Sequence, residues 1–366
     1  MNITVNRKDF LQSLQLGSSF SGKNKALSAL DYTRLVFKDN NCRVTSNDGE
    51  MAITTAYTLD NGVDEQKEYY VEAKTLINAL RSIKEDTISI AFDDNTCVIK
   101  HSRGVFNIPL MDVDVYPVPT MDKDSTNVSV SSELLFNWLK EARQFVAEDE
   151  LRPVMNGVYL YIKDNTIGVC ASDGHRLYTD SSSFEHDGDV DAVLSSKAIA
   201  TLLETINNTD STTVYFGDRN VAFRAGCTSI MCRKIDGRYP NFNSVIPKTH
   251  AFTAEFVKAD LVESLSRCLI MANTNCLVKM SIGGLEAKFV AEDIDFSKKG
   301  EEFVSVQSSS TGPFEIGFKG TFAKVCLDVI SSDNVVMELT DATRAIVMKD
   351  ANNECKTILL MPMACQ

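Results

Sequence analysis

The 366-residue sequence has no long apolar run and no basic leader followed by an apolar stretch. A transmembrane helix needs about 20 consecutive apolar residues, so neither a membrane span nor a secretory signal is predicted. The ten cysteines are scattered along the chain, and no CxxC pair occurs. This pattern favours reduced, mostly buried thiols in a cytoplasmic protein over a disulfide framework.

Motifs for catalysis or cofactor binding are also missing. The chain has no GxGxxG after a strand, no GxxxxGK[ST], no HExxH and no GxSxG. Its four histidines are dispersed, so no metal site and no cofactor are predicted. The densest polar cluster is Asp173-Gly174-His175-Arg176-Leu177, where Asp-Gly predicts a tight turn. Because a histidine beside an aspartate can act as a general base, an enzyme that uses Asp173 and His175 remains an alternative.

Basic residues are fewer than acidic residues. The chain contains 37 Lys and Arg residues against 50 Asp and Glu residues, which gives a net charge of -13. Such a charge repels DNA and counts against a protein that binds DNA by lying in a groove.

The sequence does contain a sixfold repeat, in which a short extended stretch runs into an amphipathic helix. Apolar residues recur three and four positions apart in each helix, as a core-facing stripe requires. The units start roughly sixty residues apart, so two units make a piece of about 120 residues, the usual size of a domain. The predicted helices are Arg7–Leu16, Ala73–Ile83, Ser132–Val146, Ser196–Ile206, Phe256–Met271 and Gly320–Ile330.

The segments between these helices alternate like strands and are separated by turn-prone runs such as Lys-Asp-Asn, which indicates antiparallel hairpins. One such run is expected to separate the strands Tyr32–Lys38 and Cys42–Ser46. Strands with segregated helices indicate an α+β fold. Proline and polar residues near 116–125 and 239–249 interrupt both the helical periodicity and the strand-like alternation of apolar residues. The expected domains are therefore residues 1–124, 125–249 and 250–366.

Several motifs in order along the whole chain resemble the bacterial DNA sliding clamp family, the DNA polymerase III beta subunits. They are Arg152, Asn156-Gly157, Ser172–Leu177, Asp236–Pro240, Val245-Ile246-Pro247 and Leu360–Met363. The resemblance implies three similar domains, each with two helices packed on antiparallel sheets. It also implies a homodimer that closes head to tail into a ring around duplex DNA and acts as a non-catalytic processivity factor.

A ring holds DNA by topology, so the resemblance removes the objection raised by the net charge and implies sequence-independent phosphate contacts. The DNA-binding residues expected from it and from the basic helix positions are Lys23, Lys25, Lys74, Arg81, Arg152 and Lys197. At the dimer interface, Phe106 and Ile108 are expected to face Ile270 and Met271 of the second copy.

The resemblance further implies a peptide pocket between domains two and three. Its expected partners are the DNA polymerase III catalytic subunit, the clamp loader and other proteins with a clamp-binding motif, in the cytoplasm at the nucleoid. The chain departs from the family at Ser244, Cys276, Lys319 and its Ala364-Cys365-Gln366 tail, so a clamp paralogue of one lineage or mobile element with an altered partner motif is an alternative. The expected pocket residues are Met155, Ser172, Gly174, His175, Arg176, Leu177, Pro240, Val245, Phe322, Thr343, Leu360, Met361, Pro362 and Met363.

Overall fold

The computed structural model describes residues 1–24, 26–121 and 124–364. The chain forms two compact units, which are described separately. The first unit contains residues 1–136 and 200–234, and the second contains residues 137–199 and the chain from 235 onward. Within the described residues, no helix is long and apolar enough to cross a membrane.

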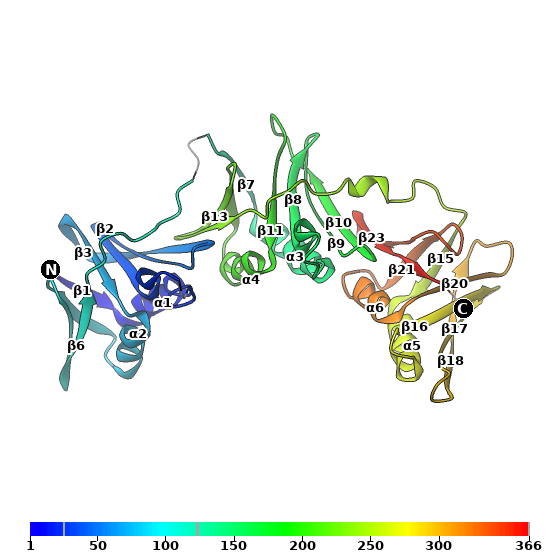
Figure 1. The fold of residues 1–366 in the computed structure, drawn as a ribbon, viewed down its shortest axis with the longest axis horizontal. Coiled ribbons are helices and arrows are strands. Elements are labelled where there is room, and N and C mark those ends of the chain that lie inside the picture. The colour runs from blue at the N-terminus through cyan, green and yellow to red at the C-terminus, as the bar shows by residue number, and fades with distance from the viewer. Residues whose placement is uncertain (25, 122–123, 365–366) are drawn as a thin grey trace. The chain divides into compact units, whose positions relative to one another are not determined.

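The six predicted helices are confirmed, and each directly follows a strand (Figure 1). The fifth helix begins two residues later than predicted, because Phe256 is still paired with Val335 in a sheet. The first helix is capped by Asn6, whose side chain accepts hydrogen bonds from the backbone N–H groups of Lys8 and Asp9. The helices are α1 (Arg7–Gly17), α2 (Ala73–Ser82), α3 (Ser132–Ala142), α4 (Ser196–Thr205), α5 (Lys258–Met271) and α6 (Gly320–Asp328).

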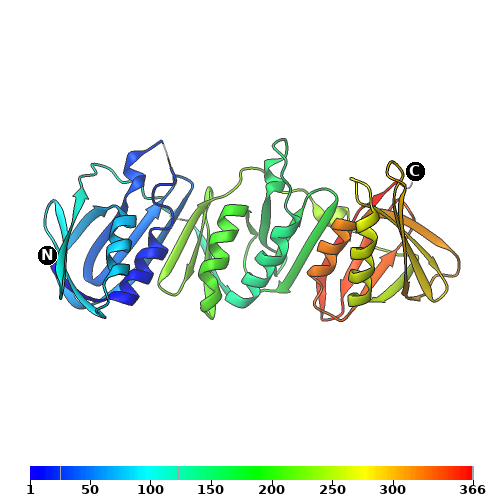
Figure 2. The same ribbon diagram turned by 90° about the horizontal axis from the view of Figure 1, so that it is seen from below.

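The first unit is built on one antiparallel sheet. Helices α1 and α2 lie side by side (Figure 2). They pack on this sheet through a core that includes Phe10, Leu14, Leu76 and Leu80. Its strands, in spatial order, are β1 (Asn2–Asn6), β4 (Thr87–Phe92), β5 (Thr96–His101), β6 (Gly104–Met111), β3 (Met51–Val71), β14 (Thr228–Arg233), β13 (Asn220–Ala225), β12 (Ser211–Phe216) and β7 (Thr126–Ser131), while β2 (Thr33–Asn47) also pairs with β3.

The predicted hairpin at Asp39 is wrong. β2 continues through this position and keeps its pairing with β3, with register shifts between Phe37 and Asp39 and between Asp39 and Asn41. Asp39 adopts a φ of 51°, a left-handed conformation that aspartate tolerates better than most residues. The run therefore forms a bulge inside a long strand.

The second unit contains two antiparallel sheets, and α5 and α6 contact each other as well as strands of both sheets. The nine-stranded sheet has the order β11 (Val190–Ser195), β8 (Gly157–Lys163), β9 (Thr166–Ser172), β10 (Arg176–Ser183), β23 (Asn353–Leu360), β22 (Ile346–Asp350), β21 (Asn334–Leu339), β15 (Phe252–Val257) and β19 (Gln307–Ser308). The five-stranded sheet has the order β18 (Lys298–Ser305), β17 (Glu286–Asp293), β16 (Leu277–Gly283), β20 (Phe314–Lys319) and β24 (Pro362–Met363).

An ionic cluster is buried where α3 meets β22 and β23. The ammonium of Lys356 lies 2.8 Å from a carboxylate oxygen of Glu141 and 3.5 Å from one of Asp350, and it donates to the carbonyl of Val329. Tyr178 donates its hydroxyl hydrogen to Glu141 over 2.7 Å. The side chains of Lys356 and Asp350 are 6% and 0% exposed, so each charge depends on its partners for stability.

Candidate functional site

The second unit contains a cavity of about 690 Å³, within the range typical of ligand sites. Its wall combines apolar side chains with three arginines and one histidine, and none of the described aspartates and glutamates lines it. The lining residues are Arg152, Met155, Ser172, Gly174, His175, Arg176, Leu177, Tyr239, Pro240, Asn241, Phe242, Ser244, Val245, Ile246, Pro247, Thr343, Arg344, Ala345, Leu359 and Met361.

The turn between β9 and β10 forms one side of the cavity. One carboxylate oxygen of Asp173 accepts hydrogen bonds from the backbone N–H groups of His175 (2.8 Å) and Arg176 (2.7 Å). Gly174 has a φ of 86°, which an L side chain rarely adopts. The hydroxyl of Ser172 accepts from the Gly174 N–H and donates to the Arg176 carbonyl. These bonds hold the turn in one conformation.

Arg176 connects this turn to two helical segments. Its guanidinium lies 2.8 Å from the second carboxylate oxygen of Asp173, and its side chain is only 9% exposed. The same group lies 5.4 Å from the centroid of the Phe145 ring and 4.2 Å from that of Phe322, which are cation–π distances. The ring of His175 lies 6.0 Å from that of Phe322, so α6 borders the cavity at this point.

The chain crosses from the nine-stranded to the five-stranded sheet at Met361. Leu360 is buried and paired with both Arg176 and Ile346. The next two residues after Met361 pair with β20 instead. Met361 itself bonds through its N–H to the carbonyl of His175 and is 42% exposed. The change of sheet therefore turns the Met361 side chain into the cavity.

Comparisons with known proteins agree along the whole chain. Family models of the DNA polymerase III beta subunit match residues 1–122 (N-terminal domain), 129–241 (central domain) and 243–364 (C-terminal domain). The chain belongs to the bacterial DNA sliding clamp family. It is similar to the beta sliding clamp of Pseudomonas putida, with 23% identity over 99% of this chain and 100% of the relative. Sliding clamps are processivity factors without catalytic activity, so the chain is not an enzyme.

Solved sliding clamps share the fold over the full chain. The DNA polymerase III subunit beta of Pseudomonas aeruginosa has a TM-score of 0.93 at 23% identity, with 100% of both chains covered. The beta subunit of Thermotoga maritima has a TM-score of 0.87 at 21% identity, again with 100% of both chains covered. These similarities confirm the predicted α+β clamp fold and do not favour a paralogue with a different role.

The geometry of the β9–β10 turn agrees with a non-catalytic clamp. Both carboxylate oxygens of Asp173 are engaged, one by backbone N–H groups and the other by Arg176. A catalytic aspartate would instead orient the imidazole of His175. Across the described residues, no group of three or more His, Cys, Asp or Glu side chains could hold a metal ion.

The structure brings ten of the fourteen expected pocket residues to the cavity wall. Phe322 lies behind His175, Leu360 is buried in the sheet, and Pro362 and Met363 join β24. Met363 lines a separate cavity near Lys279 and Glu292. Wall residues that the sequence reasoning missed are Arg152, Tyr239, Asn241, Phe242, Ser244, Ile246, Pro247, Arg344, Ala345 and Leu359. Most belong to the connector 239–247. Its motifs indicated the family, but they did not predict which of its side chains face the cavity.

The expected DNA-binding residues lie in different settings. Lys74 and Arg81 are exposed on α2 and line a groove of about 950 Å³ in the first unit. Lys23 lies over the ring of Phe20, and Lys197 is exposed at the start of α4. Lys25 lies outside the described residues. Arg152 lines the cavity of the second unit and pairs with Asp149. Its contact with DNA stays a prediction.

The expected dimer residues are only partly at the surface. Phe106 is 36% exposed and stacks on His101, whereas Ile108 is 3% exposed and belongs to the core of the first unit. The expectation for Ile108 is therefore corrected: β6 turns this side chain inward, and of the two expected β6 residues only Phe106 reaches the surface. Ile270 and Met271 are 70% and 36% exposed at the end of α5.

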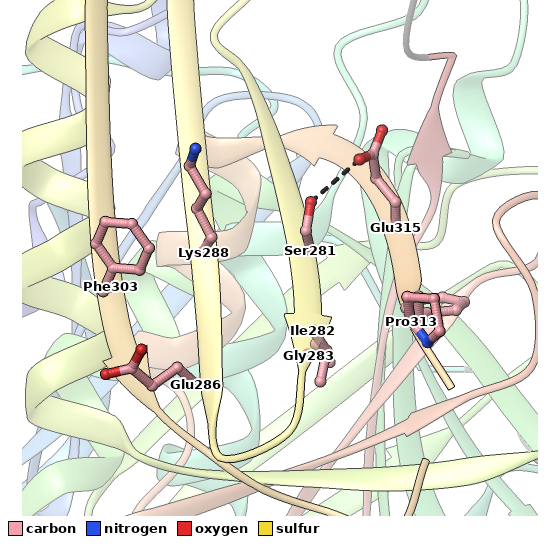
Figure 3. A pocket seen from close by; sticks show the side chains of 9 residues that line it. Ser281, Ile282, Gly283, Glu286, Lys288, Phe303, Pro313 and Glu315 are labelled. Atoms are coloured by element: carbon pink, nitrogen blue, oxygen red, sulfur yellow. Dashed lines mark hydrogen bonds between the residues drawn. The ribbon is translucent and has the colours of Figure 1, made fainter. Parts of the chain in front are cut away.

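A third cavity of this unit, of about 390 Å³, lies on the five-stranded sheet (Figure 3). Lys288 and Phe303 come from β17 and β18, and the hydroxyl of Ser281 donates to Glu315 across β16 and β20. None of the expected pocket residues lines it. Phe303 itself belongs to β18, the edge strand of this sheet, and is 59% exposed.

Proposed function

We propose that two copies of this chain close head to tail into a ring around duplex DNA and tether the DNA polymerase III catalytic subunit, the clamp loader and other proteins through the cavity at Met361. The observation that supports this proposal best is that cavity, in a chain that matches the sliding clamp family from end to end. The chain itself supplies no chemical step.

Two free sheet edges support ring closure. In the part of the chain that the structure describes, residues 104–109 of β6 pair with β5 alone, because β3 reaches β6 only at Leu110 and Met111. β18 is the outer strand of its sheet. Unpaired strand edges readily accept a strand of another chain. In the proposed dimer β6 of one copy lies beside β18 of the other, and twofold symmetry creates this contact twice.

Exposed apolar side chains flank both edges. Phe106 lies on β6, and Phe303 lies on β18. Met271 lies against Gly300 of β18, where a Cβ atom would meet the Met271 side chain at 3.0 Å. A stable contact of this kind buries about 1,200–2,000 Å². Ile270 and Met271 would then be covered by the partner.

The cavity at Met361 suits a short apolar peptide. Leu177, Tyr239 and Val245 supply apolar surface, and burial of such surface provides most of the binding free energy of small motifs. Methionine adapts its shape to different side chains, so Met155 and Met361 allow several partners to use one site.

The ring also explains how a chain with a net charge of -13 functions on DNA. Lys74, Arg81 and Lys197 need to provide only weak phosphate contacts, because a closed ring is retained by topology. Phosphate contacts weaken steeply as salt rises, whereas a topological link does not.

The test is retention on circular and linear DNA. The full-length protein is loaded by its clamp loader on nicked circles, washed at high salt, and then the circles are cut. We expect retention through the wash and release after cutting. A Lys74→Glu, Arg81→Glu, Lys197→Glu variant should load poorly but remain on circles once loaded. Equal loss from circular and linear DNA at high salt would refute the ring.

A further inference from the structure

We infer that the cavity at Met361 selects peptides with an acidic side chain beside their apolar anchors, and that Lys319 is the residue that recognises this acid. The inference rests on the proposed function, because it specifies the chemistry of the segment captured at that same cavity. Three features support it: the charge balance of the cavity wall, the position of Lys319, and the absence of a carboxylate partner for its ammonium.

The arginines of the cavity wall are already neutralised. Each one pairs with an aspartate three residues earlier in the chain. Each aspartate also accepts a backbone N–H bond from its own turn, which fixes the pair locally. The pairs are Arg152 with Asp149 (2.8 Å), Arg176 with Asp173 (2.8 Å) and Arg344 with Asp341 (3.5 Å).

Lys319 is placed next to the wall from two sides. Its ammonium lies 4.3 Å from the centroid of the Phe322 ring, and that ring neighbours His175. On the other side, Gly317 pairs with Met363 and Phe318 with Pro362. Lys319 and Met361 are the next residues of the two strands beyond these pairs, and Met361 lines the cavity.

The charge of Lys319 is not balanced locally. Among the residues that the structure describes, no carboxylate forms an ion pair with Lys319, whose ammonium instead lies over Phe322. The guanidinium of Arg176 lies over the same ring, 4.2 Å from its centroid, so two cations surround one aromatic side chain. Only Arg176 has an aspartate partner. A carboxylate brought by a bound peptide would supply the missing counter-charge.

The expected preference is modest, since Lys319 is only half-buried. Partly exposed ion pairs contribute about 0.2–1 kcal/mol, which corresponds to about a 1.4- to 5-fold change in affinity. A lysine is a compact charge on a flexible stem and can follow a carboxylate at more than one peptide position. The preference is therefore expected within a short stretch of the peptide.

The experiment uses fluorescein-labelled nonapeptides with a glutamine- and leucine-rich core, in which a single Glu or Gln is moved through the flanking positions. Affinities for the full-length protein are measured by fluorescence polarisation at low and high salt. We expect at least one position where Glu binds about 1.4- to 5-fold more tightly than Gln at low salt, with the advantage reduced at high salt.

Variants assign the effect to one side chain. Lys319→Gln should abolish the advantage of Glu, and Lys319→Glu should make a Lys-substituted peptide the tighter ligand. Lys324→Gln on α6 is the matched control: it also removes one positive charge, but within the described residues Lys324 neither lines the cavity nor lies over Phe322, so the preference should remain. Thermal melting of each variant verifies folding.

The outcomes separate the inference from the proposed function. If the neutral peptide binds and Met361→Ala weakens it, the cavity captures peptides whatever the charge result. If the advantage of Glu then persists in Lys319→Gln, or no position favours Glu, the role of Lys319 is overturned. If no peptide binds the wild-type protein, the proposed cavity function fails and the inference fails with it.

Discussion

Met361 and Met363 provide a sharp test of the peptide site, because they are two residues apart and only one faces the cavity. Met361 lines the cavity and is 42% exposed, whereas Met363 pairs with Gly317 in β24 and lines a different cavity. Met361→Ala should weaken peptide binding, and Met363→Ala should leave the affinity unchanged. Both substitutions remove the same atoms from the same chain segment.

The size of the effect follows from the exposed fraction of Met361. Complete burial of a methionine side chain contributes about 1.5–3 kcal/mol. A peptide can cover only the 42% that is exposed, so the loss is at most about 0.6–1.3 kcal/mol, or roughly three- to eightfold in the dissociation constant. Alanine retains part of this surface, so values near the lower end are expected.

The assay is fluorescence polarisation with one glutamine- and leucine-rich peptide and the three proteins, wild type, Met361→Ala and Met363→Ala. Sedimentation of each variant controls for assembly, and melting controls for folding. An equal loss of affinity in both variants would mean that the local chain conformation, and not the Met361 side chain, governs binding. An unchanged affinity in Met361→Ala would show that the peptide does not occupy this cavity.

Further predictions concern assembly and stability. Ile270→Asp together with Met271→Asp should yield a folded monomer in analytical ultracentrifugation. The control variant Leu285→Asp, at another exposed apolar residue, should stay dimeric. A wild-type protein that sediments as a monomer at micromolar concentration would contradict the ring. Lys356→Ala leaves Glu141 and Asp350 without their cation and should lower the free energy of unfolding in urea by about 3–5 kcal/mol; a loss below about 1 kcal/mol would show that water compensates these charges. Burial raises the pKa of Asp350, but hydrogen bonds from Ser331 and Asn352 and the charge of Lys356 outweigh it, so the net pKa is lowered. The stabilisation by this carboxylate is thus present above its unfolded pKa of about 3.9 and lost as the pH falls through the folded pKa. Asp350→Asn should therefore flatten the fall in stability as the pH drops below about 4, and an unchanged acid slope would contradict this role.

Most helices and strands could be predicted because their signals are local. The stripe of Leu76, Ile77 and Leu80 identifies α2 without knowledge of what covers it. The cavity was accessible only through the family resemblance, because its wall combines residues from near 152, 172, 240, 344 and 361. No periodicity in the sequence relates these segments. The Met361 side chain faces the cavity because the chain passes from one sheet to the other at this residue.

The run Lys-Asp-Asn shows where local information ends. At 163–165 it forms the turn between β8 and β9, with φ values of 50° and 54° at Asp164 and Asn165. At 38–40 it forms a bulge within β2, with a φ of 51° at Asp39. In both places the sequence by itself determined that the backbone can enter the left-handed region, since Asp and Asn tolerate it. Whether the chain then reverses or continues was decided by the tertiary structure, because only β3, a strand of twenty-one residues, offers β2 hydrogen-bond partners on both sides of Asp39.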